Sequence, residues 1–272
     1  MRLIRLRTPR HWRRTRLFLV ALAVAGLAFA LIGRPVVGGV LFGSALLGVV
    51  LFEFTHLRRL VVENHRQQYA LVQIRPLLGE LSLELGGWAA DPVMAHNVVR
   101  LLVDTRPRVV VECGSGSSTV VISRCLRALG RGRVISLEHD PEYASRTAGL
   151  LRLHGLEDLA TVVTAPLTAL EVNGRIFRWY SSRYDPLLQD KIDVLLIDGP
   201  PGNTGPRARY PAVPVLKPHL AAECWVMLDD GDRPDERQIA HAWSRELGAK
   251  LSYLEGGRGG WLLHRQPSTT GT

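Results

Sequence analysis

The sequence predicts an α/β fold, a doubly wound and mostly parallel sheet that ends in an antiparallel hairpin, preceded by a hairpin of two transmembrane helices. Two long uncharged apolar runs lie before residue 55, and short apolar runs alternate with helix-like stretches from residue 88 onward. A glycine-rich turn also follows an apolar, strand-like run. We therefore expect a basic tail (1–16), two transmembrane helices (17–54), a helical stalk or linker (55–84), the α/β domain (85–265) and a disordered tail (266–272).

The positive charge of the chain is concentrated at its N-terminus. The formal net charge of the 272 residues is +9, and seven arginines occur without an acid in the first sixteen residues, so 9 − 7 leaves +2 for the rest. A basic tail beside an apolar segment attracts anionic lipid headgroups. Nucleic acid is the weaker explanation of this charge, and we expect no nucleic-acid partner. The cysteines show no paired spacing, which favours a reducing compartment.

The two apolar runs are each just long enough to cross a thin bilayer. Residues 17–33 and 36–52 carry no charged side chain, and Arg34 and Pro35 separate them. Arginines flank both outer ends, whereas the connecting turn has only Arg34. Positive-inside bias therefore predicts a multi-pass protein of the cell membrane whose N-terminus and α/β domain are cytoplasmic.

Small residues in both runs would let the two helices approach closely. Gly39 and Gly43 stand four residues apart, as do Ala21 and Ala25. A secretory or twin-arginine signal is the alternative, because two arginines precede an apolar stretch with a small-residue cleavage pattern at residues 28–30. A signal peptide is normally followed by polar sequence, however, and here a second apolar run follows.

Strand-like and helix-like segments alternate through the predicted α/β domain. The predicted strands are residues 108–112, 133–138, 160–164, 192–197 and 224–228. The predicted helices are residues 94–103, 118–129, 141–154 and a proline-interrupted segment at 209–220. Asn173 and Gly174 between two apolar stretches predict an inserted hairpin, and residues 251–255 and 261–264 predict the terminal one.

The most informative stretch is Val-Val-Val-Glu-Cys-Gly-Ser-Gly-Ser-Ser-Thr at residues 109–119, a strand that leads through a glycine turn into a helix. Glycine lets the backbone approach a ligand, and the free N–H groups of a helix start favour polar or anionic groups. Glu138 ends the next predicted strand, 24 residues after Gly114, where an acid can accept hydrogen bonds from both ribose hydroxyls. Together these features indicate a cofactor of the adenosine type.

Three motifs in order resemble class I S-adenosylmethionine-dependent methyltransferases. They are the Gly-Ser-Gly-Ser-Ser-Thr turn at 114–119, Ser-Leu-Glu-His-Asp at 136–140 and Ile-Asp-Gly-Pro-Pro at 197–201, a combination similar to that of a bacterial subgroup. The resemblance covers about residues 85 to 265 and implies a Rossmann-like fold with S-adenosylmethionine as cofactor. It implies cofactor-binding roles for Glu112, Gly114, Gly116, Ser117, Ser118, Glu138, His139 and Asp198.

Within this resemblance, Glu112 and the glycine turn would lie near the methionine part of the cofactor. Glu138 would hold the ribose, and His139 would flank the adenine. The chain departs from the family pattern after the third strand, where Ala165 and Pro166 stand in place of an acid that often reads the adenine amine.

Acidic residues follow the fourth and fifth predicted strands. Asp198 lies where open α/β sheets place reacting groups, and it is the candidate to remove or polarise an acceptor proton. Asp198, Asp229 and Asp230 together would suit Mg²⁺, an arrangement similar to cation-dependent O-methyltransferases except that Asp230 replaces an asparagine. The alternative is that the adjacent acids form a solvated loop or helix cap before Pro234.

The sequence therefore predicts a membrane-anchored methyltransferase that acts on a hydroxyl of a small molecule, a lipid or a lipid-linked glycan. Two alternatives stay open. A nicotinamide-dependent oxidoreductase would share the sheet, but Thr119 stands where its fingerprint needs a small residue. A non-catalytic Rossmann-like membrane scaffold would not need the intact Glu112, Gly114, Gly116, Glu138 and Asp198 at the strand ends. The sequence favours no particular oligomeric state.

Overall fold

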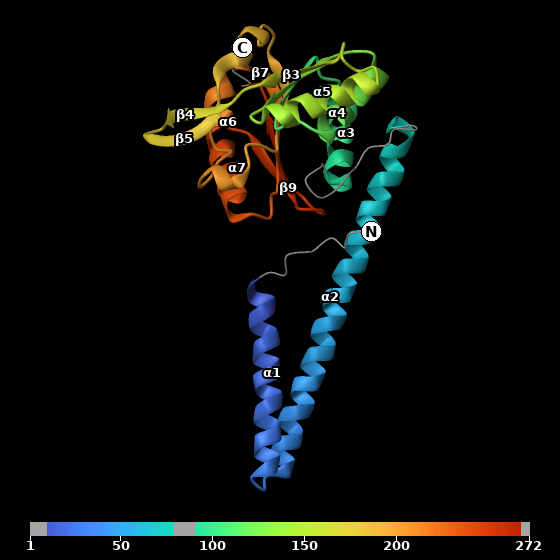
Figure 1. Ribbon diagram of the computed structural model, residues 1–272, viewed down its shortest axis with the longest axis vertical. Coiled ribbons are helices and arrows are strands. Elements are labelled where there is room, and N and C mark those ends of the chain that lie inside the picture. Colours follow the sequence, from blue (N-terminus) through green and yellow to red (C-terminus); the bar gives the residue numbers. More distant parts are fainter. Residues whose placement is uncertain (1–9, 79–90, 268–272) are drawn as a thin grey trace. The chain divides into compact units, whose positions relative to one another are not determined.

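A computed structural model describes residues 10–78 and 91–267 of the chain. It forms two compact units, Met1–His65 and Arg66–Thr272 (Figure 1). Parts of three predicted segments lie outside the described residues: residues 1–9 of the basic tail, 79–90 around the start of the domain, and 268–272 of the C-terminal tail.

The first unit is a hairpin of two helices, α1 (Arg10–Leu31) and the first part of α2 (Pro35–Leu78). Both helices are long and apolar enough to cross a membrane, by length and composition. Gly33 turns the chain between them with a φ of 79°, and Pro35 occupies the first helical position, where its missing N–H is of no consequence. Arg16 and Glu53 pair across the hairpin at 2.6 Å.

Glycines bring the two helices together, but not the glycines that we predicted. A Cβ on Gly26 would lie 2.8 Å from the Phe42 nitrogen, and one on Gly38 would lie 2.6 Å from the Gly26 carbonyl oxygen. Gly39 and Gly43 have nothing within 4 Å of such an atom. The prediction that Gly39 and Gly43 lie at the helix contact is therefore wrong. A four-residue spacing marks one face of a helix but does not say whether that face meets the partner helix.

Helix α2 continues into the second unit. The predicted stalk is helical as far as Leu78, with Pro76 in the last turn of α2. Residues from Arg66 onward belong to the same compact unit as the α/β domain. Ile74 is completely buried and packs with Leu78, Ala95 and Val121. This burial offsets the loss of one backbone hydrogen bond at the proline.

A seven-stranded sheet forms the centre of the second unit, in the order β3-β2-β1-β6-β7-β9-β8. The pairs β3–β2, β2–β1, β1–β6 and β6–β7 are parallel, and β9 runs antiparallel to both β7 and β8. The strands are β1 (Val109–Cys113), β2 (Arg133–Glu138), β3 (Ala160–Thr164), β6 (Ile192–Ile197), β7 (Leu220–Asp229), β8 (Lys250–Leu254) and β9 (Gly260–Arg265). The predicted fold class and the terminal hairpin are confirmed.

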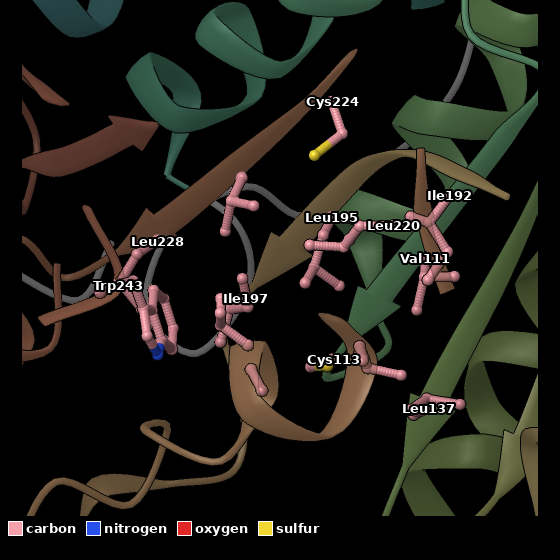
Figure 2. Close-up of a cluster of buried hydrophobic side chains, with 14 of the residues drawn as sticks. Val111, Cys113, Leu137, Ile192, Leu195, Ile197, Leu220, Cys224, Leu228 and Trp243 are labelled. Carbon is pink, nitrogen blue, oxygen red and sulfur yellow. The ribbon is translucent and has the colours of Figure 1, made fainter. Parts of the chain in front are cut away.

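Helices cover both faces of this sheet. They are α3 (Pro92–Thr105), α4 (Ser117–Leu129), α5 (Pro141–Leu153), α6 (Ala212–Leu216) and α7 (Pro234–Leu247). Successive strand residues point to opposite faces, so Val110 packs with α3 and α4 whereas Val111 packs in the cluster that contains residues of α6 and α7. Figure 2 shows this second cluster, with labelled side chains from β1, β2, β6 and β7 and with Trp243 of α7 beside Leu228 and Ile197.

The predicted hairpin at Asn173 and Gly174 is present as a separate two-stranded sheet, β4 (Leu167–Val172) and β5 (Arg175–Tyr180). Both turn residues have positive φ values, 51° and 72°, as a two-residue hairpin turn requires. The 3₁₀ helix η1 (Ser182–Leu187) then leads to β6. This hairpin takes the place of a crossover helix between β3 and β6.

One helix prediction needs correction, and one helix was not predicted. The segment at 209–220 contains only the short α6 and a 3₁₀ helix, η3 (Lys217–His219), because its three prolines remove backbone donors. Helix α7 was not predicted at all. Its signals were present: Pro234 at the first helical position, two acids in the first turn, and Gly248 in the left-handed conformation at the end.

Candidate active site

The carboxyl ends of β1, β2, β6 and β7 meet at one edge of the sheet because these strands are parallel neighbours. Cys113 ends β1, and its carbonyl oxygen accepts hydrogen bonds from the Asp198 and Gly199 nitrogens at 3.0 and 2.7 Å. The Gly114 nitrogen donates to the Leu137 carbonyl oxygen of β2 at 2.8 Å. The predicted site residues on three strands are thus joined by main-chain bonds.

Gly114 lies directly against Gly199. A Cβ on Gly114, whose φ is 97°, would be 3.0 Å from the Gly199 nitrogen. A Cβ on Gly199 would meet the Tyr180 hydroxyl as well as the Gly114 backbone. Only glycine fits both positions, and the two turns leave bare backbone at the sheet edge, where a ligand can approach closely.

Glu112 holds the glycine turn in place through hydrogen bonds with side chains around it. It is fully buried, and its Oε2 atom accepts hydrogen bonds from the Thr119 hydroxyl at 2.6 Å and the Ser136 hydroxyl at 2.8 Å. The Thr119 hydroxyl oxygen in turn accepts from the Gly116 nitrogen at 3.1 Å. Burial raises the pKa of Glu112 to about 7, although neighbouring hydroxyl groups favour the ionised form. Glu112 therefore shapes the turn and the start of α4, where Ser117 and Ser118 lie.

Glu138 ends β2 and is held at both oxygens. Its Oε2 atom accepts from the Ser115 nitrogen and hydroxyl at 3.0 and 3.2 Å, and its Oε1 atom accepts from the Asp140 nitrogen at 3.0 Å. The Nδ1 atom of His139 lies 2.8 Å from Oε1. Burial favours a higher pKa for Glu138, but the bonds from His139, Asp140 and Ser115 lower it below its ordinary value. Only 5% exposed, Glu138 is not a surface ion pair.

His139 lines a cavity beside this site. The cavity has a volume of about 510 Å³ and is lined by His139, Pro166, Leu167, Arg178, Asn203 and Thr204. The hydrogen bond to Glu138 raises the pKa of His139, against the effect of its partial burial. Pro166 follows β3 and lines this cavity. The cavity therefore has an apolar side chain at the position where the methyltransferases that the sequence resembles often carry an acid.

Three aromatic residues of β5 and η1, Trp179, Tyr180 and Tyr184, are buried in the core. The Tyr180 hydroxyl lies at Gly199 and has no hydrogen-bond partner among the described residues. His241 lies exposed on α7 with its ring against Trp261, and the structure does not bring it to the site.

Asp198, Asp229 and Asp230 converge, as the sequence predicts. One carboxylate oxygen of each lies within 4.8 Å of the others. Asp229 and Asp230 are each 2% exposed, which excludes the alternative of a solvated loop, and the residue before α7 is Arg233, so neither acid caps that helix. Burial, with the charges of Asp198 and Asp230, raises the pKa of Asp229 to about 8.

Arg209 is the site residue that sequence reasoning missed. The sequence shows it only as the first residue of the proline-interrupted segment at 209–220, but its side chain is 3% exposed and lies among these carboxylates. Its Nη2 atom donates to Asp230 Oδ2 at 2.8 Å and Asp198 Oδ1 at 3.1 Å, and Nη1 donates to the Asp229 carbonyl oxygen at 3.0 Å. Burial lowers the pKa of Arg209, but the surrounding carboxylates raise it by more.

Comparison with known proteins agrees with this geometry. Residues 111–231 match the family model described as "Methyltransferase domain". None of the curated proteins compared with the chain matches it.

Two solved structures have a similar fold. The SAH-bound methyltransferase PaMTH1 of Podospora anserina has 12% identity and a TM-score of 0.51, over 65% of this chain and 80% of its own. The O-methyltransferase TomG of Streptomyces achromogenes, solved with SAM, has 14% identity and a TM-score of 0.50, over 75% and 98%. At these identities the likeness concerns the fold. Residues 111–231 are thus similar to a methyltransferase domain, and the sheet order is that of the Rossmann-like class I methyltransferase fold.

Proposed function

We propose that this domain binds S-adenosylmethionine at the ends of β1 and β2 and transfers its methyl group to an acceptor hydroxyl. One observation carries the proposal. The bare backbone at Gly114 and Gly199 lies between an acid that ends β2, Glu138, and an acid that follows β6, Asp198, inside the matched methyltransferase region. When bound, the cofactor supplies an activated methyl group on a sulfonium, and the protein supplies the surrounding contacts.

Glu138 is the residue that we assign to the ribose. A carboxylate has about four acceptor positions, and all four of its present donors come from the domain itself. Two of these donors, the Ser115 hydroxyl and the His139 ring, are side-chain groups that a rotation can release. Two ribose hydroxyls would take their places, while the backbone bonds from Ser115 and Asp140 keep the carboxylate fixed.

The backbone of Gly114 and Gly116 would lie along the methionine part, with Glu112 as a positioning residue beneath it. Glu112 is fully buried and acts through Thr119, whose hydroxyl oxygen holds the Gly116 nitrogen. Ser117 and Ser118 begin α4, whose N-terminal end favours the cofactor carboxylate. His139 would flank the adenine from the cavity side.

Asp198 is the candidate base for a hydroxyl acceptor. Arg209 holds its Oδ1 atom, and the side chain remains 29% exposed, so the carboxylate is both oriented and accessible. A carboxylate in this position would accept the acceptor proton as the methyl group is transferred. Proximity and alignment of the acceptor oxygen would supply most of the rate enhancement.

We further propose that the chain is a multi-pass protein of the cell membrane with the methyltransferase domain in the cytoplasm. Two helices of sufficient length and apolar composition, and a basic N-terminal tail, support this arrangement. An acceptor at the bilayer, such as a lipid or lipid-linked glycan, would then be concentrated near the site. A small-molecule acceptor would be reached from the cytoplasm instead.

The cofactor is tested by heat protection of the full chain in detergent. A ligand that binds only the folded state stabilises it by RT ln(1 + [L]/Kd), so the melting temperature rises with the logarithm of the ligand concentration above Kd. We expect S-adenosylmethionine and S-adenosylhomocysteine to raise it and NAD to leave it unchanged. Protection by NAD alone would instead support an oxidoreductase, and protection by none of the three would support a scaffold.

The acceptor is tested with cofactor labelled on the methyl group, added to membranes that contain the chain. Label in the lipid extract would identify a membrane acceptor, and label in the aqueous fraction a soluble one. Asp198→Asn provides the control for chemistry, because the amide keeps the size of the side chain but cannot act as the base. We expect this variant to bind the cofactor and to transfer no label; transfer at the wild-type rate would remove Asp198 from its proposed role.

A further inference from the structure

A buried cluster of oppositely charged side chains surrounds Asp198. Four carboxylates, Asp198, Asp229, Asp230 and Glu236, face three guanidinium groups, those of Arg209, Arg233 and Arg258. Charges removed from water are costly unless they are paired and hydrogen-bonded. Here each carboxylate lies within 4.0 Å of at least one guanidinium nitrogen, so the cluster supplies its own counter-charge.

Arg209 stands where a divalent cation would have to bind. Mg²⁺ needs oxygen ligands at about 2.0 to 2.1 Å around a nearly octahedral centre. The Arg209 Nη2 atom lies between the two carboxylates, 3.1 Å from Asp198 Oδ1 and 2.8 Å from Asp230 Oδ2. The third acid is engaged as well, because Arg258 Nη2 lies 3.0 Å from Asp229 Oδ2. The residues present therefore do not fit a metal ion alongside the guanidinium.

We propose that Arg209 is a built-in cation that replaces a divalent metal ion in this acidic triad and holds Asp198 in position for the acceptor. Its role through Asp198 rests on the proposed methyl transfer, whereas its replacement of the metal ion does not. A guanidinium remains protonated at any physiological pH and offers a planar set of donors, so it binds several fixed oxygens at once.

The contacts of Arg209 explain how one side chain can do this. Besides the two carboxylates, it donates to the Asp229 carbonyl oxygen at 3.0 Å and to the Pro200 carbonyl oxygen at 3.4 Å. It thus joins the segment after β6, which carries Asp198, to the end of β7, where Asp229 and Asp230 lie. Arg209 is therefore a positioning residue: it contacts the candidate base and its neighbours but not the expected methyl group.

The proposal predicts an exchange of one cation for another. The wild-type full chain in detergent should show the same melting temperature in EDTA and in about 10 mM Mg²⁺ or Mn²⁺. Arg209→Ala removes the guanidinium and leaves the acids, so we expect Mn²⁺ to raise its melting temperature by about 5 to 10 °C near saturation. Arg209→Lys keeps a positive charge and should respond much less than the alanine variant.

Arg233→Ala is the matched control. Arg233 also contacts Asp230, at 2.9 Å, but its side chain is 48% exposed, so water can take its place and no response to cations is expected. Tryptophan fluorescence follows the unfolding, because Trp179 and Trp243 are buried in the domain.

Two results would overturn the proposal. One is a wild-type chain that Mg²⁺ or Mn²⁺ stabilises and that loses this response in Asp230→Asn, because the triad would then hold a metal ion despite Arg209. The other is a folded Arg209→Ala variant that no divalent cation stabilises. If that variant does not fold, the wild-type measurement still decides. Cofactor binding is measured separately, so failure of the methyltransferase proposal would be recognised independently.

Discussion

At the scale of single residues, Glu138 combines a structural and a ligand-binding role in one carboxylate. Its bonds to Ser115 and Asp140 connect the glycine turn after β1 with the start of α5. A ligand that replaces the side-chain donors would therefore find an acceptor that is already oriented, and binding would cost little reorganisation.

Glu138→Gln tests this role. The amide nitrogen cannot accept a hydrogen bond, so one ribose hydroxyl would lose its partner, and we expect S-adenosylhomocysteine to bind about five-fold more weakly or worse, a loss of at least about 1 kcal/mol. Calorimetry measures the affinity. Glu142→Gln, an exposed position on α5, should leave it unchanged. Unchanged affinity in Glu138→Gln would remove the ribose assignment.

Glu112 makes stability depend on pH. Its pKa is raised from 4.5 to about 7 in the folded domain, so the folded state holds a proton that the unfolded chain has released. The unfolding free energy should therefore fall as pH rises from about 4.5 to about 7, by up to about 3 kcal/mol from this group. Glu112→Gln should flatten that decline, as measured by denaturant unfolding across this range. Glu157→Gln, exposed before β3, should retain it; an equal slope in all three proteins would contradict the assigned pKa.

Most candidate site residues could be predicted because they stand within a few positions of a strand end. An apolar run that stops at a glycine or an acid indicates the end of a strand at the sheet edge. This signal is present at Glu112, Gly114, Glu138 and Asp198. Arg209 has no such signal in the sequence. It lies in a loop before α6, and only the folded chain shows that the carboxylates of β6 and β7 surround it.

At the scale of elements, the same reasoning explains which helices and strands could be predicted. Strands β2, β3 and β6 match their predicted bounds because each is a short segment rich in β-branched and apolar residues between clear turns. Helix α7 has a mostly polar sequence, and its four buried apolar residues, Ile239, Ala240, Trp243 and Leu247, recur at helical spacing among charged ones. The helical spacing of these apolar residues is present in the sequence, but a search for continuous apolar runs does not detect it.

The helix hairpin provides a prediction at this scale. Gly26→Leu would place a side chain against the Phe42 backbone, whereas Gly39→Leu would find open space. We expect the first to separate the helices and the second to leave them paired. A thiol cross-linker between Arg16→Cys and Glu53→Cys, whose parent side chains form an ion pair, reports the pairing in detergent. Equal cross-linking in both glycine variants would show that the hairpin does not depend on this close approach.

The buried end of α2 provides a second prediction, about the stability of the second unit. Ile74 is completely buried within the second unit, so Ile74→Ala should destabilise that unit by about 2 to 4 kcal/mol in denaturant unfolding. Val72→Ala, at a side chain that is 64% exposed, should change stability by less than about 0.5 kcal/mol. If both variants unfold alike, residues 66–78 are a spacer and not part of the domain.

At the scale of the whole molecule, one chain joins an apolar helix hairpin to a methyltransferase domain through a single helix. Helix α2 begins in the first unit and ends buried in the second. A fragment that starts near Leu78 would therefore lack the buried face contributed by Ile74. Biochemical work should use the full chain, and it should treat the helix hairpin and the domain as separately folded units.

The central claim is that the strand-end site binds S-adenosylmethionine. Calorimetric titration of the full chain in detergent with S-adenosylhomocysteine, and separately with NAD, each with and without Mg²⁺, tests it most directly. We expect S-adenosylhomocysteine to bind with a Kd on the order of micromolar, about −8 kcal/mol, unaffected by Mg²⁺, and NAD to give no heat of binding. Binding of NAD alone, or of neither ligand, would contradict it.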